Sequence, residues 1–207
     1  MSSVKKAAMA TAVVVAAGCA LLVVSSLVRL VAHGVSAREE PTALETSVAR
    51  AMRRLATPTM TRDMQNPVSL CEEALADARA HFADHCALCH GNDGRGTTPL
   101  GQNLYPKAPD MTLADTQGLT DGELFAIITN GIRLTGMPAW GTGSREDDQS
   151  TWRLVHLIRN LGAITPLQLE EMKSMNPRSR AQFEQEEIER RWLEGESAKM
   201  PSNKGNH

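Results

Sequence analysis

The residues best suited to chemistry in this sequence are two thiols and an imidazole that lie within five consecutive positions. Cys86, Cys89 and His90 form the pattern C-x-x-C-H, and a glycine-rich stretch follows directly after them. This pattern has three chemical interpretations: covalent attachment of haem, half of a zinc site, or a thiol–disulfide redox pair. Each interpretation makes a different demand on the rest of the chain.

The demands of zinc and of redox chemistry are not met by the sequence. A zinc site needs two further ligands, commonly a second C-x-x-C or an H-x-x-x-H pair, and none follows residue 90. A thioredoxin-like pair is expected in a βαβ unit, and no segment of residues 69–165 alternates like a strand. Covalent haem is therefore favoured, with the two thiols bonded to its vinyl groups and His90 as an iron ligand.

An iron atom held by His90 needs a second axial ligand or an open position. Met137 follows 47 residues later and stands between Gly136 and Pro138, so a rigid loop would present its thioether. Met111 is the rival, but it follows His90 by only 21 residues and leaves less chain to surround a haem.

The elements that must position these residues have helical periodicity. A helix leading into the C-x-x-C-H pattern is predicted by apolar side chains at steps of three and four, namely Cys71, Leu75, Ala78, Phe82 and Cys86. Cys71 is thus expected to be buried, while His81 and His85 fall on another, solvated part of the helix.

Two further helices and their loops complete this domain. Thr120 and Glu123 form a capping box, and Gly131 is placed to end the helix that they begin. A last helix carries one apolar stripe, which consists of Leu154, Leu157, Ile158 and Leu161. Residues 91–118 are rich in Gly, Pro, Asn and Asp and predict a long loop. The block is therefore all-α.

The N-terminal region predicts a membrane segment followed by a linker. Residues 7–28 are uncharged and, at about 1.5 Å per residue, long enough to cross a bilayer. A cleaved signal peptide is the alternative, with Val35-Ser36-Ala37 as its cleavage site. Within the linker, Thr42 and Glu45 form a capping box for a short helix with Leu44, Val48, Met52 and Leu55 on one face. Arg50, Arg53 and Arg54 beside that face favour a membrane surface, and a solvated spacer is the alternative.

Composition limits the possible partners. Residues 69–165 carry 7 Lys and Arg against 12 Asp and Glu, and no part of the chain is basic enough for nucleic acid. Aromatic residues make up only 3% of the chain, so a large apolar cofactor would help to fill the core.

The chain resembles the bacterial, membrane-anchored class I monohaem cytochromes c over about residues 69–165. Four stretches in the expected order carry the resemblance: HCALCHGNDGRG, LYPKAPD, LTDGELFAIITNGIRLTGMPAWG and WRLVHLIRNL. It implies an all-α, cytochrome c-like domain of helices and long loops around one covalent haem c, preceded by an N-terminal transmembrane helix. We expect four regions: an anchor or uncleaved signal (1–33), a linker (34–68), the haem domain (69–165) and a charged tail (166–207).

The resemblance also implies roles for individual residues. Cys86 and Cys89 would be the thioether attachment points, His90 the proximal ligand and Met137 the distal ligand. The Pro99 carbonyl would accept the proton on His90 Nδ1, which fixes the orientation of the imidazole.

Three more residues match positions near the haem or its propionates in such domains. These are Tyr105, Arg133 and Trp140. A solvated charge is the alternative for Arg133, and ordinary packing is the alternative for Trp140.

The function implied is one-electron transfer by a membrane-tethered carrier with its haem domain in the periplasm. Its partners would be redox proteins, with a dehydrogenase or quinol-oxidising complex on one side and a terminal acceptor such as an oxidase on the other. No catalytic residue, small-molecule substrate or nucleic acid is expected, and the linker of about 35 residues would give the domain reach. The alternatives are a soluble periplasmic carrier after signal cleavage, and a haem enzyme or gas or peroxide sensor in which the Met ligand is displaced.

Overall fold

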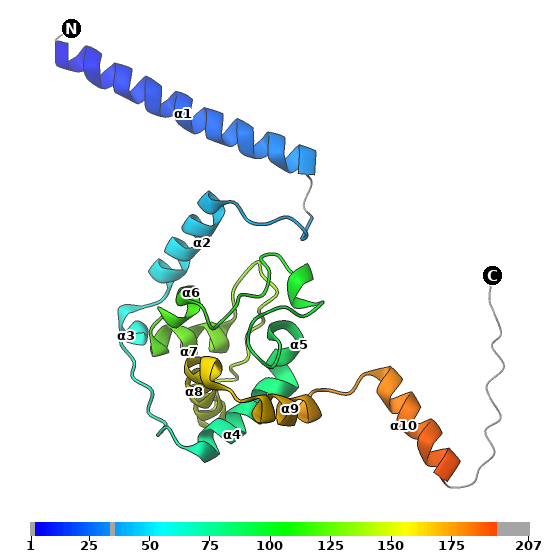
Figure 1. The fold of residues 1–207 in the computed structure, drawn as a ribbon. Helices are drawn as coiled ribbons and strands as arrows, with labels where there is room; N and C mark the ends of the chain where they lie inside the picture. The colour runs from blue at the N-terminus through cyan, green and yellow to red at the C-terminus, as the bar shows by residue number, and fades with distance from the viewer. Residues whose placement is uncertain (1–2, 34–35, 194–207) are drawn as a thin grey trace, which may run out of the picture.

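The computed structural model describes residues 3–33 and 36–193, and every regular element in these ranges is a helix (Figure 1). In chain order these elements are α1 (Ser3–His33), α2 (Ala43–Ala56), α3 (Thr59–Arg62), α4 (Glu72–His81), η1 (Phe82–Cys86), α5 (Ala87–His90), η2 (Gly101–Asn103), α6 (Ala114–Gln117), α7 (Asp121–Asn130), α8 (Arg145–Asn160), η3 (Leu161–Ala163), α9 (Pro166–Met175) and α10 (Arg180–Leu193). The predicted all-α fold is confirmed.

The hydrophobic core lies where α8 packs against α4 and α7. The predicted stripe of α8 is buried along its length, and Val155, between two of its members, is fully buried. Trp152 stacks on Phe125 of α7 with ring centroids 4.3 Å apart, so two of the chain's few aromatic side chains join these helices. The core therefore fixes the ends of α4 and α7, from which the two candidate ligand segments emerge.

Local signals that begin and end helices are confirmed. The side chains of Thr42 and Thr120 each accept a hydrogen bond from the backbone N–H three residues on. The glutamate side chains at those positions, Glu45 and Glu123, accept the backbone N–H of the threonine in turn. Gly131 ends α7 with a positive φ of 64°. Because these contacts span only a few residues, the sequence pattern is sufficient to predict them.

The helix that leads into C-x-x-C-H differs from the prediction in phase. Ala74, Ala78 and Phe82 form its buried line, whereas Cys71 is exposed. The prediction for Cys71 was wrong because this residue precedes the first turn, where its sulfur accepts the Ala74 N–H at 3.5 Å as an N-cap. One wide π turn, η1, then separates α4 from α5.

Residues 40–68, which we call the strap, lie against the domain instead of forming a free spacer. Gly122 allows the closest approach, since a Cβ there would lie 1.8 Å from the Thr61 carbonyl oxygen. Further contacts are Glu40–Lys107, Arg50–Asp115, Thr120 Oγ1 to the Arg62 carbonyl, Asn66 Nδ2 to the Trp152 carbonyl, and His156 Nε2 with the Val68 carbonyl. The linker therefore does not provide the reach expected from its length.

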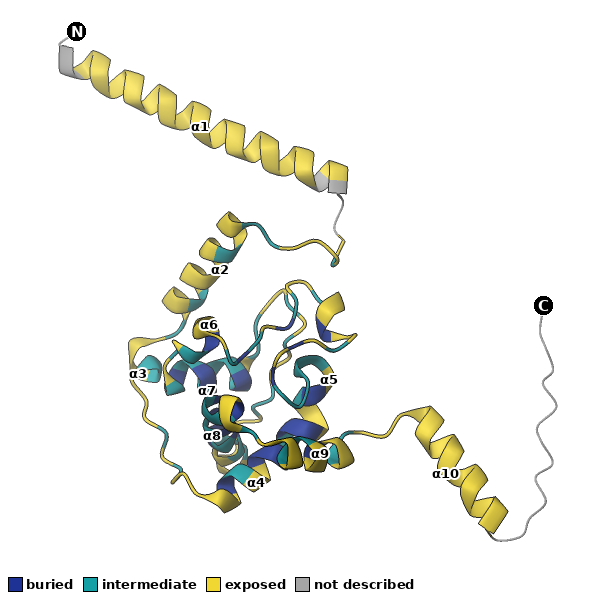
Figure 2. Cartoon of the chain, in the orientation of Figure 1, coloured by how far each residue is buried: buried dark blue, intermediate teal, exposed yellow. Residues whose placement is uncertain are grey.

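The core continues past the predicted domain end at residue 165. Helix α9 begins with a capping box at Thr165 and packs on α4 and η1, where Met172 is fully buried. The sequence did not predict this contact, because most residues next to Met172 in the sequence are polar. Helix α10 extends away from the domain and is exposed throughout (Figure 2). Residues 194–207 of the predicted tail lie outside the described residues.

Helix α1 is exposed along its described side chains and carries a span, Lys5–Arg29, with a mean hydropathy of 2.5. By length and composition it is suited to cross a membrane, and a signal sequence near an N-terminus meets the same criteria. Of the alternative cleavage site, Val35 lies outside the described residues.

Candidate functional site

The C-x-x-C-H residues occupy the last turns of a helical run that the core holds in place. Phe82 and Ala83 of η1 and Ala87 of α5 are buried, which fixes one face of the run. Cys86 and Cys89 lie at the edge of this packing and are half-buried, with free thiols. π turns insert one extra residue and are frequent at functional sites, and here the turn ends at the first of the two thiols.

The loop after His90 folds back onto α5 and is bonded to it. The Thr98 hydroxyl lies 2.9 Å from both the Leu88 and the Cys89 carbonyl oxygens, and accepts the Gly101 N–H at 2.9 Å. The Gly96 N–H donates to the His90 carbonyl at 2.7 Å. The carbonyls at the end of α5 thus find partners in the loop that follows.

Two glycines permit this close return of the loop. A Cβ at Gly101 would lie 2.1 Å from the Cys89 carbonyl oxygen. A Cβ at Gly96, where φ is +69°, would lie 2.3 Å from the Ala108 carbonyl oxygen. Only glycine fits at these contacts, because the obstructing atoms belong to the backbone and have no freedom to rotate away.

His90 is held by this loop through its backbone, while its ring lacks a partner. The Nδ1 atom is buried without a hydrogen bond, and burial lowers the pKa of the imidazole. The contact predicted between this Nδ1 and Pro99 is not formed in the structure, where the Pro99 carbonyl accepts the Asn103 side-chain amide at 2.7 Å. Asn103 lies four residues beyond Pro99, at the end of a short helical turn that the sequence did not indicate.

The two thiols are in an environment that suppresses thiolate formation. Burial, reinforced by Cys89, raises the pKa of Cys86 to about 12, and burial also raises the pKa of Cys89. Redox-active dithiols have the opposite property, a lowered thiol pKa. In the described part of the chain no three His, Cys, Asp or Glu side chains are grouped to hold a metal ion. Neither the redox pair nor the zinc site is favoured by this geometry.

Met137 lies in a short loop closed by its own hydrogen bonds. The Ile132 N–H donates to the Met137 carbonyl at 3.1 Å, and the Met137 N–H donates to the Thr135 hydroxyl at 3.1 Å. A Cβ on Gly131 would lie within 2.7 Å of backbone atoms of residues 137–139, so the two ends of the loop touch. The loop that carries Met137, between Gly136 and Pro138, is thus closed by contacts within itself.

Two contacts bring the Met137 loop beside the C-x-x-C-H run. The Trp140 ring meets His85 edge-on, with centroids 5.4 Å apart. A Cβ at Gly136 would lie 2.7 Å from the side chain of Leu104, which follows the loop bonded to α5. Both ends of the Met137 segment therefore contact elements that flank His90.

The rival ligand Met111 has a structural place of its own. It is buried in the core cluster, and its N–H donates to the Gly94 carbonyl at 2.8 Å. Met137, by contrast, is only half-buried. Among the described residues, the Met111 side chain is thus part of the core, whereas the Met137 side chain is not.

The three remaining predicted residues lie in different environments. Tyr105 is partly exposed and donates to Glu45 of α2 at 3.3 Å. Arg133 is exposed. Trp140 is half-buried, packs against the core and contacts His85.

The histidine pair was only partly predicted. His85 is exposed, as expected, but His81 is half-buried and meets the His85 ring with centroids 4.9 Å apart. Burial and then His85 lower the pKa of His81, against the opposing effect of Asp84 and Asp147. His85 also meets the Trp140 ring, and no local sequence signal indicates either this distant contact or the π turn that contains His85.

Comparison with known proteins identifies the family of the region that contains the C-x-x-C-H pattern and Met137. Residues 73–158 match the family described as cytochrome C oxidase, cbb3-type, subunit III. These residues form a monohaem c-type cytochrome domain. No curated protein matches the chain. We call residues 73–158 the cytochrome domain.

The side chains of the cytochrome domain fit the group that its family implies, haem c. Two neutral thiols suit thioether bonds, and a neutral imidazole suits an iron ligand. The buried Nδ1 of His90 has no hydrogen-bond partner, and an unsatisfied polar atom in the interior is the kind of feature that a bound group explains. Sequence reasoning missed Thr98 and Gly101, although the string Thr-Pro-Leu-Gly at residues 98–101 is a recognisable turn signal.

Proposed function

We propose that this chain is a one-electron carrier tethered to the cytoplasmic membrane, with one haem c bonded to Cys86 and Cys89. In this proposal His90 and Met137 would bind the haem iron. The observation that carries it is the closed Met137 loop, which contacts elements on both sides of the C-x-x-C-H run. Haem bound with His and Met ligands supplies reversible one-electron chemistry at a raised potential.

The protein's own contribution is to hold both ligand segments still. The Thr98 hydroxyl fixes the carbonyls of Leu88 and Cys89, and the hydrogen bonds of the Met137 loop fix its thioether segment. A thioether is a weak, neutral ligand, and its bond to iron would provide little energy for ordering a mobile loop. The loop must therefore already hold the thioether in place. If both residues bound the iron, no position on it would remain open to a substrate.

The location and partners follow from the anchor and the family. Helix α1 is suited to a membrane span, and we place the cytochrome domain on the periplasmic side. The matching family is named for a subunit of a cytochrome oxidase. We propose redox partners in the same membrane, with a dehydrogenase or quinol-oxidising complex as donor and a terminal acceptor such as an oxidase.

The attachment is tested by variants of the full chain expressed with a cytochrome c maturation system. Wild type should retain haem on a denaturing gel, and the double variant Cys86→Ala, Cys89→Ala should lose it. Cys71→Ser is the matched control, because Cys71 is exposed and serine is a favoured N-cap. Colourless wild-type protein, or haem retained by the double variant, would refute the proposal.

The ligation is tested by spectroscopy of the oxidised protein. A sulfur-to-iron charge-transfer band in the near infrared and slow carbon monoxide binding after reduction are expected of a carrier. Absence of the band together with rapid carbon monoxide binding would instead identify a haem enzyme or gas sensor with a displaceable methionine.

A further inference from the structure

Helix α2 faces the cytochrome domain with its polar side. Thr46 and Arg53 are its half-buried residues, and they lie seven positions apart on one face. Arg50 lies between them on the same face and pairs with Asp115 at 2.5 Å. Of the three arginines predicted to meet a membrane, two are therefore turned toward the protein.

The opposite face of α2 is apolar and exposed. Its side chains are Leu44, Val48, Met52 and Leu55, with exposed fractions of 57%, 48%, 65% and 86%. A surface helix normally buries its apolar stripe against the core and turns its polar face to water. In α2 this arrangement is inverted, so the apolar face needs a cover that lies outside the cytochrome domain.

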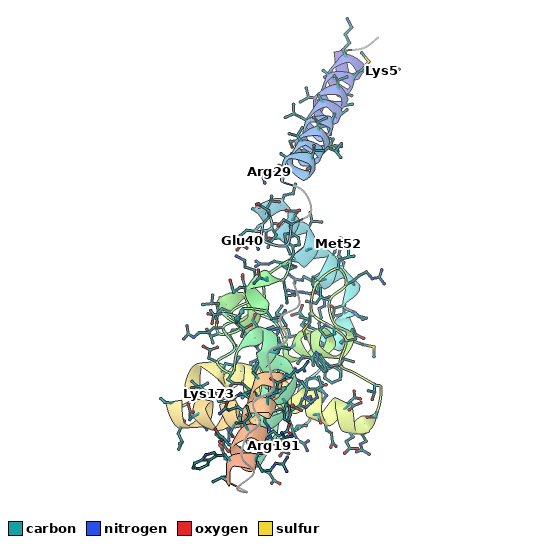
Figure 3. The ribbon with its side chains drawn as sticks, turned by 90° about the vertical axis from the view of Figure 1, so that its right-hand side faces the viewer. Lys5, Arg29, Glu40, Met52, Lys173 and Arg191 are labelled. Atoms are coloured by element: carbon teal, nitrogen blue, oxygen red, sulfur yellow. The ribbon has the colours of Figure 1, made fainter. Side chains whose placement is uncertain are left out.

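Helix α2 lies between the cytochrome domain and the candidate membrane span. Figure 3 shows Glu40 and Met52 on the side of the domain from which α1 leaves. The nine residues 34–42 separate the helices, a distance of at most about 30 Å when extended.

We propose that α2 lies in the headgroup region of the phospholipid bilayer that α1 crosses, with its apolar face inserted. This inference rests on the membrane tether of the proposed function. A short connection holds α2 at the level of the headgroups, and a bilayer surface is an apolar cover already present there. The exposed Arg54, beside the apolar face, would meet anionic lipids.

The consequence is a fixed orientation of the cytochrome domain on the membrane. The strap, which includes α2, is held to the domain by the ion pairs Glu40–Lys107 and Arg50–Asp115 and by the hydrogen bond from Tyr105 to Glu45. Single exposed ion pairs contribute little, but these two act together with the Tyr105 hydrogen bond and the close contact at Gly122. With α2 on the bilayer, the domain would present one side to the lipid and meet membrane partners in a restricted range of orientations.

The test uses the full haem-loaded protein, one copy per nanodisc, in mixed phosphatidylcholine and phosphatidylglycerol. A spin label is attached at Val48→Cys after Cys19 and Cys71 are changed to Ser. Leu167→Cys is the control, since Leu167 is 81% exposed on α9. At Val48 the label should collide more often with oxygen, which dissolves in lipid, than with a water-soluble nickel chelate, and at Leu167 the order should reverse.

Three other results would overturn the proposal. Equal nickel accessibility at both positions would show that α2 stays in water. Protection of Val48 only in discs with two copies would show that a second chain covers the face. Failure of the protein to enter discs would show that α1 does not anchor it in a membrane. The haem spectrum of the same samples separates these results from a failure of the cytochrome assignment, and Leu55→Cys provides a second label site.

Discussion

Replacing Gly101 by Ala should separate the loop from the helix that carries the haem-binding residues. The added Cβ would lie 2.1 Å from the Cys89 carbonyl oxygen and 2.9 Å from the Gly96 carbonyl oxygen. Both are backbone atoms, so relief requires a backbone shift of about 1 Å. Such a shift would stretch the hydrogen bonds, each 2.9 Å long, from the Thr98 hydroxyl to Cys89 and from the Ala108 N–H to Gly101.

The size of the effect follows from the bonds that are strained. Two or three hydrogen bonds at about 0.5–1.5 kcal/mol each give a loss of about 1–4.5 kcal/mol. This is a large part of the total of about 5–15 kcal/mol for a typical domain. Gly162→Ala is the matched control, because no atom lies within 4 Å of an added Cβ there and its effect should stay within about 0.5 kcal/mol.

The assay is urea unfolding of both variants and wild type, followed by haem absorbance and tryptophan fluorescence. A midpoint of Gly101→Ala clearly below that of Gly162→Ala is expected at an unchanged slope. If the two variants unfold with free energies within about 0.5 kcal/mol of each other, the loop does not depend on this close contact and the reasoning fails.

Three other substitutions test separate parts of the structure. Met137→Ala should keep the haem attached but abolish the near-infrared band and lower the reduction potential, whereas Met111→Leu should preserve both; an unchanged potential in Met137→Ala would identify a different ligand. Phe82→Ala, at a side chain only 2% exposed, should lower the free energy of unfolding by about 3–5 kcal/mol. Phe183→Ala, at a 54% exposed side chain, should change it little, and equal losses would show that the core is misplaced. Burial, then the neighbouring imidazole, lowers the pKa of His81. The contribution of neutral His81 to the free energy of unfolding should therefore be complete above the unfolded pKa of about 6.5, and it should be lost as the pH falls through the lower, folded pKa. A His81→Gln variant with the wild-type pH dependence of stability would contradict this.

Features encoded within a few residues were predictable from the sequence. The capping boxes at Thr42 and Thr120 form as expected, and α7 ends at Gly131, which has a positive φ. The apolar stripe of α8 is buried as its periodicity indicates. The C-x-x-C-H pattern also identified the cytochrome domain, because attachment to a fixed cofactor demands a fixed local spacing of thiols and imidazole.

Features that depend on contacts between distant residues were decided by the tertiary structure. Met172 joins the core through α9, and His81 is half-buried beside His85, which meets Trp140. The Pro99 carbonyl bonds Asn103 instead of His90. None of these outcomes follows from periodicity, which reports that a residue lies on a face but not what that face meets.

Helix α2 shows most directly which features the sequence determines and which the tertiary structure decides. The sequence alone determined that residues 43–56 form a capped helix with one apolar and one polar face, because the cap and the spacing are local. Only the tertiary structure decided that the polar face meets the protein and the apolar face points away. That orientation is set by long-range pairs such as Arg50 with Asp115, 65 residues apart, whose energies no local pattern contains.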